Sequence, residues 1–153
     1  MKTSVALCTY NGEKYLAAQL DSILSQEHNV DEIVICDDRS TDETFSILKN
    51  YKTRFPEIFK IFNNEQNLGY VANFEKALAL CSGEIIFFCF LDDVWYPAKV
   101  NSVIDYFKEN PSIGIVAHDL DLFGTYDGKK TFWELRKFSA ETKLSNQELL
   151  KEI

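Results

Sequence analysis

The segment Ile85–Leu91 is a run of seven apolar residues that stops abruptly at Asp92 and Asp93. A run of this length, rich in Ile and Phe, is typical of a strand buried on both faces. Two adjacent carboxylates beside such a strand are costly without a partner, because apolar surroundings disfavour the charged form. The pattern therefore predicts either a cation here, such as a divalent metal that holds an anionic ligand, or an ordinary turn or helix cap, where Asp is also common.

Apolar runs alternate with segments of helical periodicity along most of the chain. Strands and helices that alternate with short connections form a mostly parallel sheet flanked by helices, so we expect an α/β fold. Ser40 and Glu43 fit a capping box, which predicts that the second helix begins at Ser40. The expected strands are residues 4–8, 31–36, 59–62, 85–91 and 113–117.

The composition is that of a globular protein and argues against some classes of function. The chain has 153 residues, of which 46% are hydrophobic and 26% charged, enough for one domain with a core. A net charge of −8 argues against non-specific nucleic-acid binding, which needs a basic face. The four cysteines lack CxxC spacing, and no apolar run approaches the ~20 residues that span a bilayer. Since no signal peptide is evident, the expected location is the cytoplasm.

Polar clusters end three of the expected strands: Thr9-Tyr10-Asn11, Asp37-Asp38 and Asp92-Asp93. The carboxyl ends of parallel strands meet at one edge of a sheet, where α/β proteins bind their ligands. Each cluster alone is also compatible with a turn or a cap. Their joint occurrence favours one functional cleft.

The residue types in this cleft indicate a nucleotide. Tyr10 can stack on a planar base, and Asp38 can accept a hydrogen bond from an imide N–H of that base. Asp92 or Asp93 can hold Mg²⁺ or Mn²⁺, which prefer carboxylate and phosphate oxygens. Such an ion would neutralise the charge on a departing diphosphate. A nucleoside diphosphate bridged by a cation is thus compatible with an acidic protein.

Several motifs occur together and in order from Val5 to about Ala117. The motifs are Val5 to Gly12 (VALCTYNG), Ile33 to Asp42 (IVICDDRSTD), Asn67-Leu68-Gly69 with Asn73-Phe74, Ser82-Gly83-Glu84, and Asp92-Asp93-Val94-Trp95. In this combination the chain resembles the family 2 glycosyltransferases, which have the Rossmann-like GT-A fold. The subgroup with Asn-Leu-Gly-x-x-x-Asn-Phe and Asp-Asp-x-Trp resembles bacterial enzymes that build surface polysaccharides, including rhamnosyltransferases.

The resemblance implies roles for residues at the strand ends. Thr9, Tyr10 and Asp38 would bind the nucleoside of a UDP- or dTDP-sugar. Asn11 and Arg39 are weaker candidates at the same edge.

For the acid pair, the resemblance implies that Asp92 contacts the ribose or the sugar and that Asp93 coordinates Mg²⁺ or Mn²⁺, with Asp92 as a second metal candidate. It also implies inverting transfer to a saccharide or lipid-linked acceptor, in which a carboxylate deprotonates the acceptor hydroxyl.

Two departures from the family pattern bear on activity. Phe90 stands where the family usually has the first acid of Asp-x-Asp-Asp, which implies weaker hold on metal and donor. Residues 1–118 match the donor-binding core, whereas 119–153 match only the start of the acceptor side, so the acceptor part that supplies the catalytic base is expected to be missing. Asp119 and Asp121 match the sugar side rather than the base. The alternative interpretation is a truncated or degenerate nucleotide-sugar-binding module without catalytic activity.

Other enzyme classes lack their sequence motifs. A dinucleotide oxidoreductase needs G-x-G-x-x-G after the first strand, where the chain has Gly12 alone. No Gly-Lys-Ser/Thr of a P-loop occurs, and His28 and His118 have no partners at zinc-ligand spacing.

Two surface features leave alternatives open. Trp95 and Tyr96 either form the floor of a sugar pocket or pack in the core. We also expect some self-association, because half a fold leaves a sheet edge uncovered. A basic segment next to aromatic residues is either a solvated loop or a peripheral membrane contact. It comprises Lys129, Lys130, Arg136 and Lys137, near Phe132 and Trp133.

Overall fold

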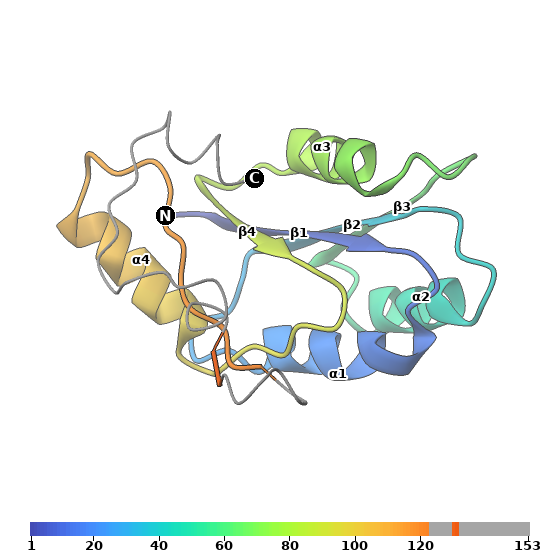
Figure 1. Ribbon diagram of the computed structural model, residues 1–153, viewed down its shortest axis with the longest axis horizontal. Coiled ribbons are helices and arrows are strands. Elements are labelled where there is room, and N and C mark those ends of the chain that lie inside the picture. Colours follow the sequence, from blue (N-terminus) through green and yellow to red (C-terminus); the bar gives the residue numbers. More distant parts are fainter. Residues whose placement is uncertain (123–129, 132–153) are drawn as a thin grey trace. The chain divides into compact units, whose positions relative to one another are not determined.

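The computed structural model describes residues 1–122 and 130–131, and the chain divides into two compact units, 1–112 and 113–153. The first unit alternates strands and helices throughout (Figure 1). The α/β fold expected from the apolar pattern is therefore confirmed. Its elements are β1 (Thr3–Thr9), α1 (Glu13–Leu24), β2 (Glu32–Asp37), α2 (Thr44–Arg54), β3 (Phe59–Asn63), α3 (Tyr70–Leu80), β4 (Ile85–Cys89) and α4 (Lys99–Glu109).

The four strands form a parallel sheet in the order β3-β2-β1-β4. Leu7 of β1 pairs in register with Ile35 of β2 on one side and with Cys89 of β4 on the other. The chain builds outward from β1 through β2 to β3 and then returns to the opposite side of β1 as β4. This reversal of strand order opens a crevice at the carboxyl ends of β1 and β4, where ligands bind in such sheets.

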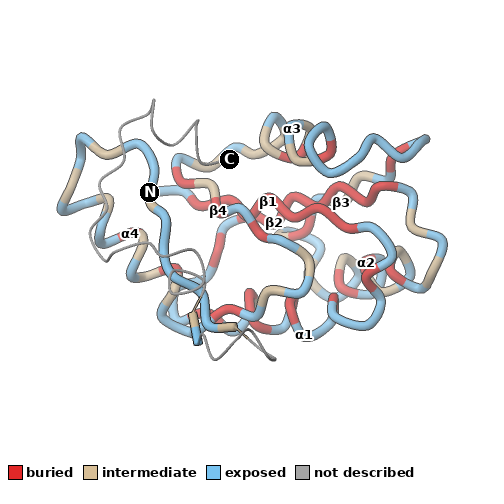
Figure 2. Tube along the Cα trace, viewed as in Figure 1, coloured by how far each residue is buried: buried red, intermediate tan, exposed pale blue. Residues whose placement is uncertain are grey.

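Helices cover both faces of the sheet. In Figure 1, α3 lies on one face, and α1 and α2 lie together on the other. Every residue of β1 and β2 is buried, as the red strands of Figure 2 show. The main apolar core lies between the strands and α1, α2 and α4, and a smaller cluster around Ala6, Cys36 and Ala77 lies beneath α3. No helix in the described part of the chain is long and apolar enough to cross a membrane.

At the amino ends of the strands, the buried carboxylate of Glu32 joins three segments. It accepts hydrogen bonds from Ser4 Oγ at 2.5 Å and from the Ser82 main-chain N–H at 2.5 Å, and it pairs with Lys60 Nζ at 2.6 Å. Burial alone would raise the pKa of Glu32, but the hydrogen bonds from Lys60, Ser4 and Ser82 outweigh it and lower the pKa to about 2. We call Glu32, Ser4, Ser82 and Lys60 the amino-end clasp.

The fifth strand predicted over 113–117 does not form. These residues carry no strand assignment and no ladder pairing, and Ile115 is exposed. A strand needs a neighbour to satisfy its backbone groups, and Gly114 contributes no side chain to pack. Within the second unit, Asp121 and Thr131 form an antiparallel bridge. Most of the basic segment and Trp133 lie outside the described residues.

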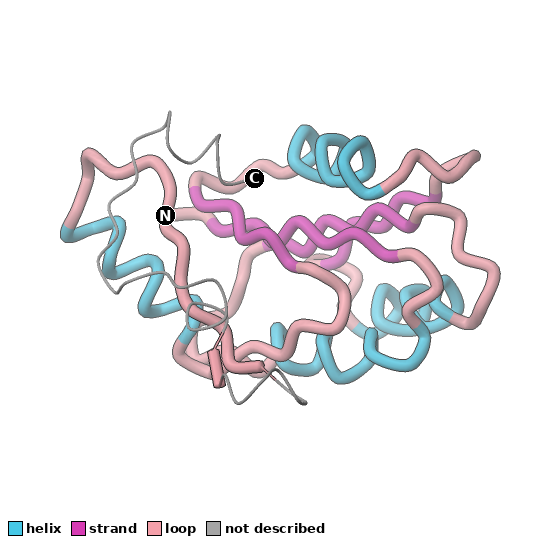
Figure 3. The backbone as a smooth tube through the Cα atoms, viewed as in Figure 1, coloured by secondary structure: helices cyan, strands magenta, loops and turns pink. Residues whose placement is uncertain are grey.

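The predicted capping box at Ser40 is also wrong. Helix α2 begins at Thr44, four residues later, and the Thr44 N–H donates to Asp42 Oδ1 at 3.0 Å. Figure 3 draws the connection from β2 to α2 as a loop. The Ser40 hydroxyl instead donates to Asp37 Oδ1 at 2.6 Å. The Ser40 Oγ also accepts the Asn11 N–H at 2.9 Å, so the oxygen that the pattern assigned to the cap binds the loop after β1 instead.

Candidate functional site

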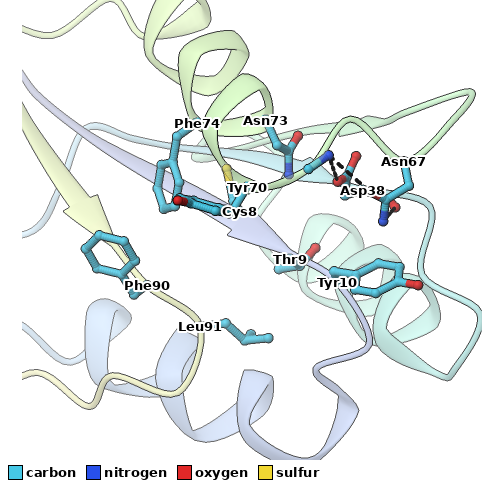
Figure 4. Close-up of a pocket in the computed structure, with 11 residues that line it drawn as sticks. Cys8, Thr9, Tyr10, Asp38, Asn67, Tyr70, Asn73, Phe74, Phe90 and Leu91 are labelled. Carbon is cyan, nitrogen blue, oxygen red and sulfur yellow. Dashed lines mark hydrogen bonds between the residues drawn. The ribbon is translucent and has the colours of Figure 1, made fainter. Parts of the chain in front are cut away.

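A cavity of about 400 Å³ lies at the carboxyl ends of β1, β2 and β4, beside the first turn of α3 (Figure 4). This is the edge at which the sequence predicted a cleft. Three of the predicted site residues, Thr9, Tyr10 and Asp38, line it together. The other lining residues are Cys8, Asn67, Gly69, Tyr70, Asn73, Phe74, Phe90 and Leu91.

Asp38 is the buried carboxylate of this cavity, and its position is fixed by three hydrogen bonds. Its Oδ1 accepts from the Leu68 N–H at 2.7 Å and from Asn64 Nδ2 at 2.8 Å, and its Oδ2 accepts from the Gly69 N–H at 2.9 Å. Gly69 takes φ 78°, a conformation that favours glycine. Because a carboxylate offers about four acceptor sites, Oδ2 keeps capacity for one more donor.

Thr9 and Tyr10 present different surfaces to the cavity. Thr9 is buried, and its hydroxyl donates to Asp37 Oδ1 at 2.8 Å, so that group is already bound. Tyr10 is 51% exposed, and its ring is one side of the cavity in Figure 4. A half-exposed ring beside a fixed carboxylate suits a planar ligand that stacks and donates one hydrogen bond.

The opposite side of the cavity is aromatic. The Phe74 ring of α3 lies 5.1 Å from the Phe90 ring and 5.8 Å from the Phe88 ring, centre to centre. Phe90 is 57% exposed, and Tyr70 extends the same side (Figure 4). The residue that replaces the family's first acid is thus part of an aromatic wall.

Asn11 and Arg39 do not line the cavity. Asn11 Oδ1 accepts the Thr41 N–H at 2.8 Å, and its own N–H donates to Ser40 Oγ, so it joins the loops after β1 and β2. Arg39 is exposed with φ 65°. Both residues stand beside the cavity edge, where they shape the loops that carry Tyr10 and Asp38.

The acid pair follows β4 next to the cavity but is not among its lining residues. Asp92 is exposed and has φ 85°. The charge of Asp93 acts on Lys99: burial lowers the pKa of this ammonium, whereas Cys89 and Asp93 act in the opposite direction. The described residues contain no group of three or more His, Cys, Asp or Glu side chains arranged for a metal.

Two adjacent carboxylates nevertheless fit one kind of metal site. Mg²⁺ is usually bound by one or two carboxylates and completes its shell with substrate phosphates and water. Asp92 and Asp93 supply that donor set, so the chemistry of the pair is compatible with an ion that arrives with a diphosphate.

Trp95 is a core residue rather than a pocket floor. It is 4% exposed, and its ring centre lies 5.6 Å from that of Phe87. The Lys99 ammonium lies 4.0 Å from the centre of the Trp95 ring. Tyr96 is exposed and does not line the cavity.

Comparison with known proteins decides the family. The sequence model described as "Glycosyl transferase family 2" matches residues 4–151. The chain belongs to glycosyl transferase family 2. The resemblance noted from the strand-end motifs is thereby confirmed, together with the GT-A type of fold.

Individual relatives of this family 2 chain are longer proteins. An uncharacterized glycosyltransferase of Nostoc sp. is 34% identical over 83% of this chain and 39% of its own length. The dTDP-rhamnosyl transferase RfbG of Shigella flexneri is 34% identical over 65% of this chain and 36% of its own length. The structure of S. aureus TarS 1-349 in complex with UDP-GlcNAc matches with a TM-score of 0.67 and 32% identity, over 72% of this chain and 32% of that TarS chain. The chain thus spans about a third to two fifths of the length of these matched chains.

Three of the lining residues that sequence reasoning did not propose as ligand-binding lie on α3. Tyr70, Asn73 and Phe74 recur at helical spacing directly after Gly69, so they share one face of the first turn. That spacing, read together with the positive end of a helix dipole, was the available signal. Cys8 also lines the cavity, and burial, with smaller effects from Cys36 and Asp38, raises the pKa of its thiol to about 12. The thiol is therefore protonated at neutral pH and is a poor nucleophile.

Proposed function

We propose that this chain binds the donor in a glycosyltransferase that moves a sugar from a UDP- or dTDP-sugar to a saccharide or lipid-linked acceptor of a bacterial surface polysaccharide. Residues 1–118 form the donor-binding part. Transfer is inverting and depends on Mg²⁺ or Mn²⁺. Family membership and relatives that act on dTDP- or UDP-linked sugars support this proposal.

The observation that carries the proposal is the state of Asp38. Two main-chain N–H groups and Asn64 fix its carboxylate and leave Oδ2 able to accept one more hydrogen bond. Uracil and thymine each offer a single imide N–H on the edge that would face it, and Tyr10 offers a ring for stacking. A base that presents two or more donors there, such as guanine, exceeds the capacity of this oxygen.

The acid pair supplies the second half of the proposal. Asp93, with Asp92 beside it, would hold the divalent ion against the diphosphate. A bound ion of this kind stabilises the negative charge of the departing nucleoside diphosphate. Lys99, on which the charge of Asp93 acts, would offset part of that charge before the donor binds.

A thermal-shift panel tests the donor class: UDP, dTDP, GDP and ADP, each with Mn²⁺ or with EDTA. A ligand at 100 times its Kd stabilises the folded state by about 2.7 kcal/mol, which shifts the melting temperature visibly. We expect shifts with UDP and dTDP that increase with Mn²⁺, and smaller shifts with GDP and ADP. Absence of any nucleotide shift in a chain that melts cooperatively would contradict the proposal.

Matched variants assign the two carboxylates. Asp38→Asn should abolish the UDP-induced shift in melting temperature both with Mn²⁺ and with EDTA. In the variant, either the amide Nδ2, which is a donor, or an Oδ1 displaced from its present position would face the imide N–H. Asp93→Asn should remove only the increase caused by Mn²⁺. Asp105→Asn, an exposed carboxylate on α4, is the control and should behave as the wild type. If Asp93→Asn retains the Mn²⁺ increase, Asp93 does not hold the metal. Binding without turnover of the donor would indicate a module that needs further protein for catalysis.

We place the reaction in the cytoplasm, at the inner face of the membrane, where a lipid-linked acceptor would lie. The basic segment with Phe132 and Trp133 supports contact with an anionic surface, and the exposed Phe88 of β4 supports self-association. Sedimentation with and without vesicles that contain anionic lipid tests both. A monomer that stays in the supernatant with vesicles would contradict both.

A further inference from the structure

The loop that carries the acid pair has no regular structure of its own. It connects the end of β4 at Cys89 to the start of α4 at Lys99. Asp92 within it takes φ 85°, which for a residue with a side chain costs roughly 1–2 kcal/mol. Loop backbone groups that are not in helices or strands must find partners elsewhere when they are buried. Contacts with residues outside the loop must therefore fix its path.

The partners are polar side chains on one neighbouring helix. Gln19 and Ser22 of α1 and Gln26 just beyond its end lie at positions i, i+3 and i+7, so they form a stripe, which we call the α1 ladder. The connection from β4 to α4 passes alongside α1 in Figure 1. The ladder meets this connection at three successive points.

Each member of the α1 ladder binds main-chain atoms of the loop. Gln19 Nε2 donates to the Phe90 carbonyl, two residues before Asp92. Ser22 Oγ accepts the Trp95 N–H at 3.0 Å, two residues after Asp93.

Gln26 completes the series. Its Nε2 donates to the Tyr96 carbonyl at 2.8 Å, and its Oε1 accepts the Val100 N–H at 3.1 Å in the first turn of α4. The acid pair thus lies between two fixed points, with a third that fixes the loop to α4.

The buried polar side chains of the α1 ladder lower the stability of the folded state. All three side chains are buried, and Gln19 is fully buried with no hydrogen-bond partner for its Oε1 within the described residues. An unsatisfied buried acceptor costs about 1–3 kcal/mol, whereas an apolar residue of similar size would pack there without that cost. Local choices that oppose stability are found mainly at functional sites.

Side-chain packing also fixes the residue before the acid pair. A Cβ on Gly12, just before α1, would lie 2.4 Å from Leu91 Cδ2, so Leu91 packs directly onto the glycine. The residue before Asp92 is therefore fixed by packing as well as by the hydrogen bond that Gln19 makes to Phe90.

We infer that the α1 ladder is a set of positioning residues that holds Asp92 and Asp93 in the geometry that binds the metal–diphosphate group. This inference rests on the proposed donor site and adds the residues that preorganise it. Gln19 Nε2 also donates to Cys89 Sγ at the end of β4 at 3.1 Å, but the ladder contacts to Phe90, Trp95, Tyr96 and Val100 are all to main-chain atoms. These contacts set the path of the loop whatever its side chains are. Without them, the loop must be ordered when the ligand binds, and the affinity falls by that entropy.

The test compares variants that remove a ladder hydrogen bond with one that removes a similar bond elsewhere on α1. Gln19→Met and Gln26→Met keep side-chain length and burial. Tyr51→Phe is the matched control, because the Tyr51 hydroxyl donates to Asp21 Oδ1 at 2.7 Å and ties α1 to α2 rather than to the loop. UDP affinity is measured by calorimetry in Mn²⁺ and in EDTA. Ser22→Ala is the milder substitute if a methionine variant does not fold.

Mn²⁺ raises the UDP affinity of the wild type by some factor over its value in EDTA. We expect this factor to be at least about tenfold smaller in the ladder variants, as is typical for residues that orient metal ligands. Their UDP affinity in EDTA, which depends on Tyr10 and Asp38, should stay within about twofold of the wild type. Tyr51→Phe should change neither value.

Hydrogen exchange of residues 90–98 supplies a readout that needs no ligand. Exchange there should accelerate in Gln19→Met and not in Tyr51→Phe. A ladder variant that keeps the full Mn²⁺ gain, or whose loop exchanges as slowly as the control, would overturn the inference. If the wild type itself gains nothing from Mn²⁺, the metal-dependent donor site fails, and the positioning role fails with it.

Discussion

The two ends of the same sheet are built in opposite ways. At the amino ends, the clasp satisfies its polar groups: the Glu32 carboxylate is shared by Ser4, Ser82 and Lys60, and Ser4 Oγ also accepts the Gly83 N–H at 2.7 Å. Such a network ties β1, β2, β3 and the start of β4 together. This end serves stability.

The carboxyl ends carry the backbone strain. The non-glycine residues with positive φ in the described chain are Asn11, Arg39 and Asp92, which follow β1, β2 and β4 in turn. Each of these conformations costs free energy and persists only because its surroundings fix it. The cavity opens at this end, so the strained residues lie beside it. From this difference we predict that stability and donor binding can be changed separately in this fold.

The largest expected effect comes from breaking the amino-end clasp. Glu32→Ala leaves the Ser82 N–H and the Ser4 hydroxyl without their acceptor and removes the partner of Lys60. We expect a loss of about 3 kcal/mol of unfolding free energy in urea denaturation, with UDP affinity unchanged. Glu57→Ala, at an exposed site, should stay within about 0.5 kcal/mol of the wild type. A drop in UDP affinity would break the separation of the two ends.

Acid should act through the same carboxylate. The pKa of Glu32 is lowered from 4.5 to about 2, so its contribution is complete above pH 4.5 and is lost as the pH falls towards 2. Between about pH 6 and pH 3, the wild type should lose about 2 kcal/mol more unfolding free energy than Glu32→Gln, which cannot titrate there. Parallel stability curves for the two proteins would show that the clasp is not the acid-sensitive element.

The smallest effect probes strain at the carboxyl end. Arg39→Gly relieves a positive φ, whereas Glu65→Gly, at an exposed loop position without one, does not. Both substitutions add similar entropy to the unfolded chain. Arg39→Gly should therefore be the more stable of the two by about 1 kcal/mol in urea denaturation. Equal stabilities would mean that the loop after β2 stores no strain.

Sequence patterns predicted the parts of the site whose chemistry is local. Thr9, Tyr10 and Asp38 each end a strand, and parallel topology alone brings them to one edge. The strands expected over 4–8, 31–36 and 59–62 form with ends that differ by at most one residue, because their apolar runs are regular.

Two predictions failed because they assumed a partner that the folded chain does not supply. Ser40 has the pattern of a cap but binds Asp37, and the segment 113–117 has the pattern of a strand but pairs with no neighbour among the described residues. Local propensity does not report which partner is nearest once the chain is folded.

By itself, the sequence determined the order of strands and helices, the family and the edge at which the cavity opens, because period, strand-end residues and parallel topology depend on neighbours in the chain. Only the tertiary structure decided that Glu32 joins three segments and that Gln19, Ser22 and Gln26 hold the loop of the acid pair. These contacts join residues 28 to 74 positions apart, and several end on main-chain atoms. A main-chain partner is the same at every position, so it leaves no pattern in the sequence that could predict it.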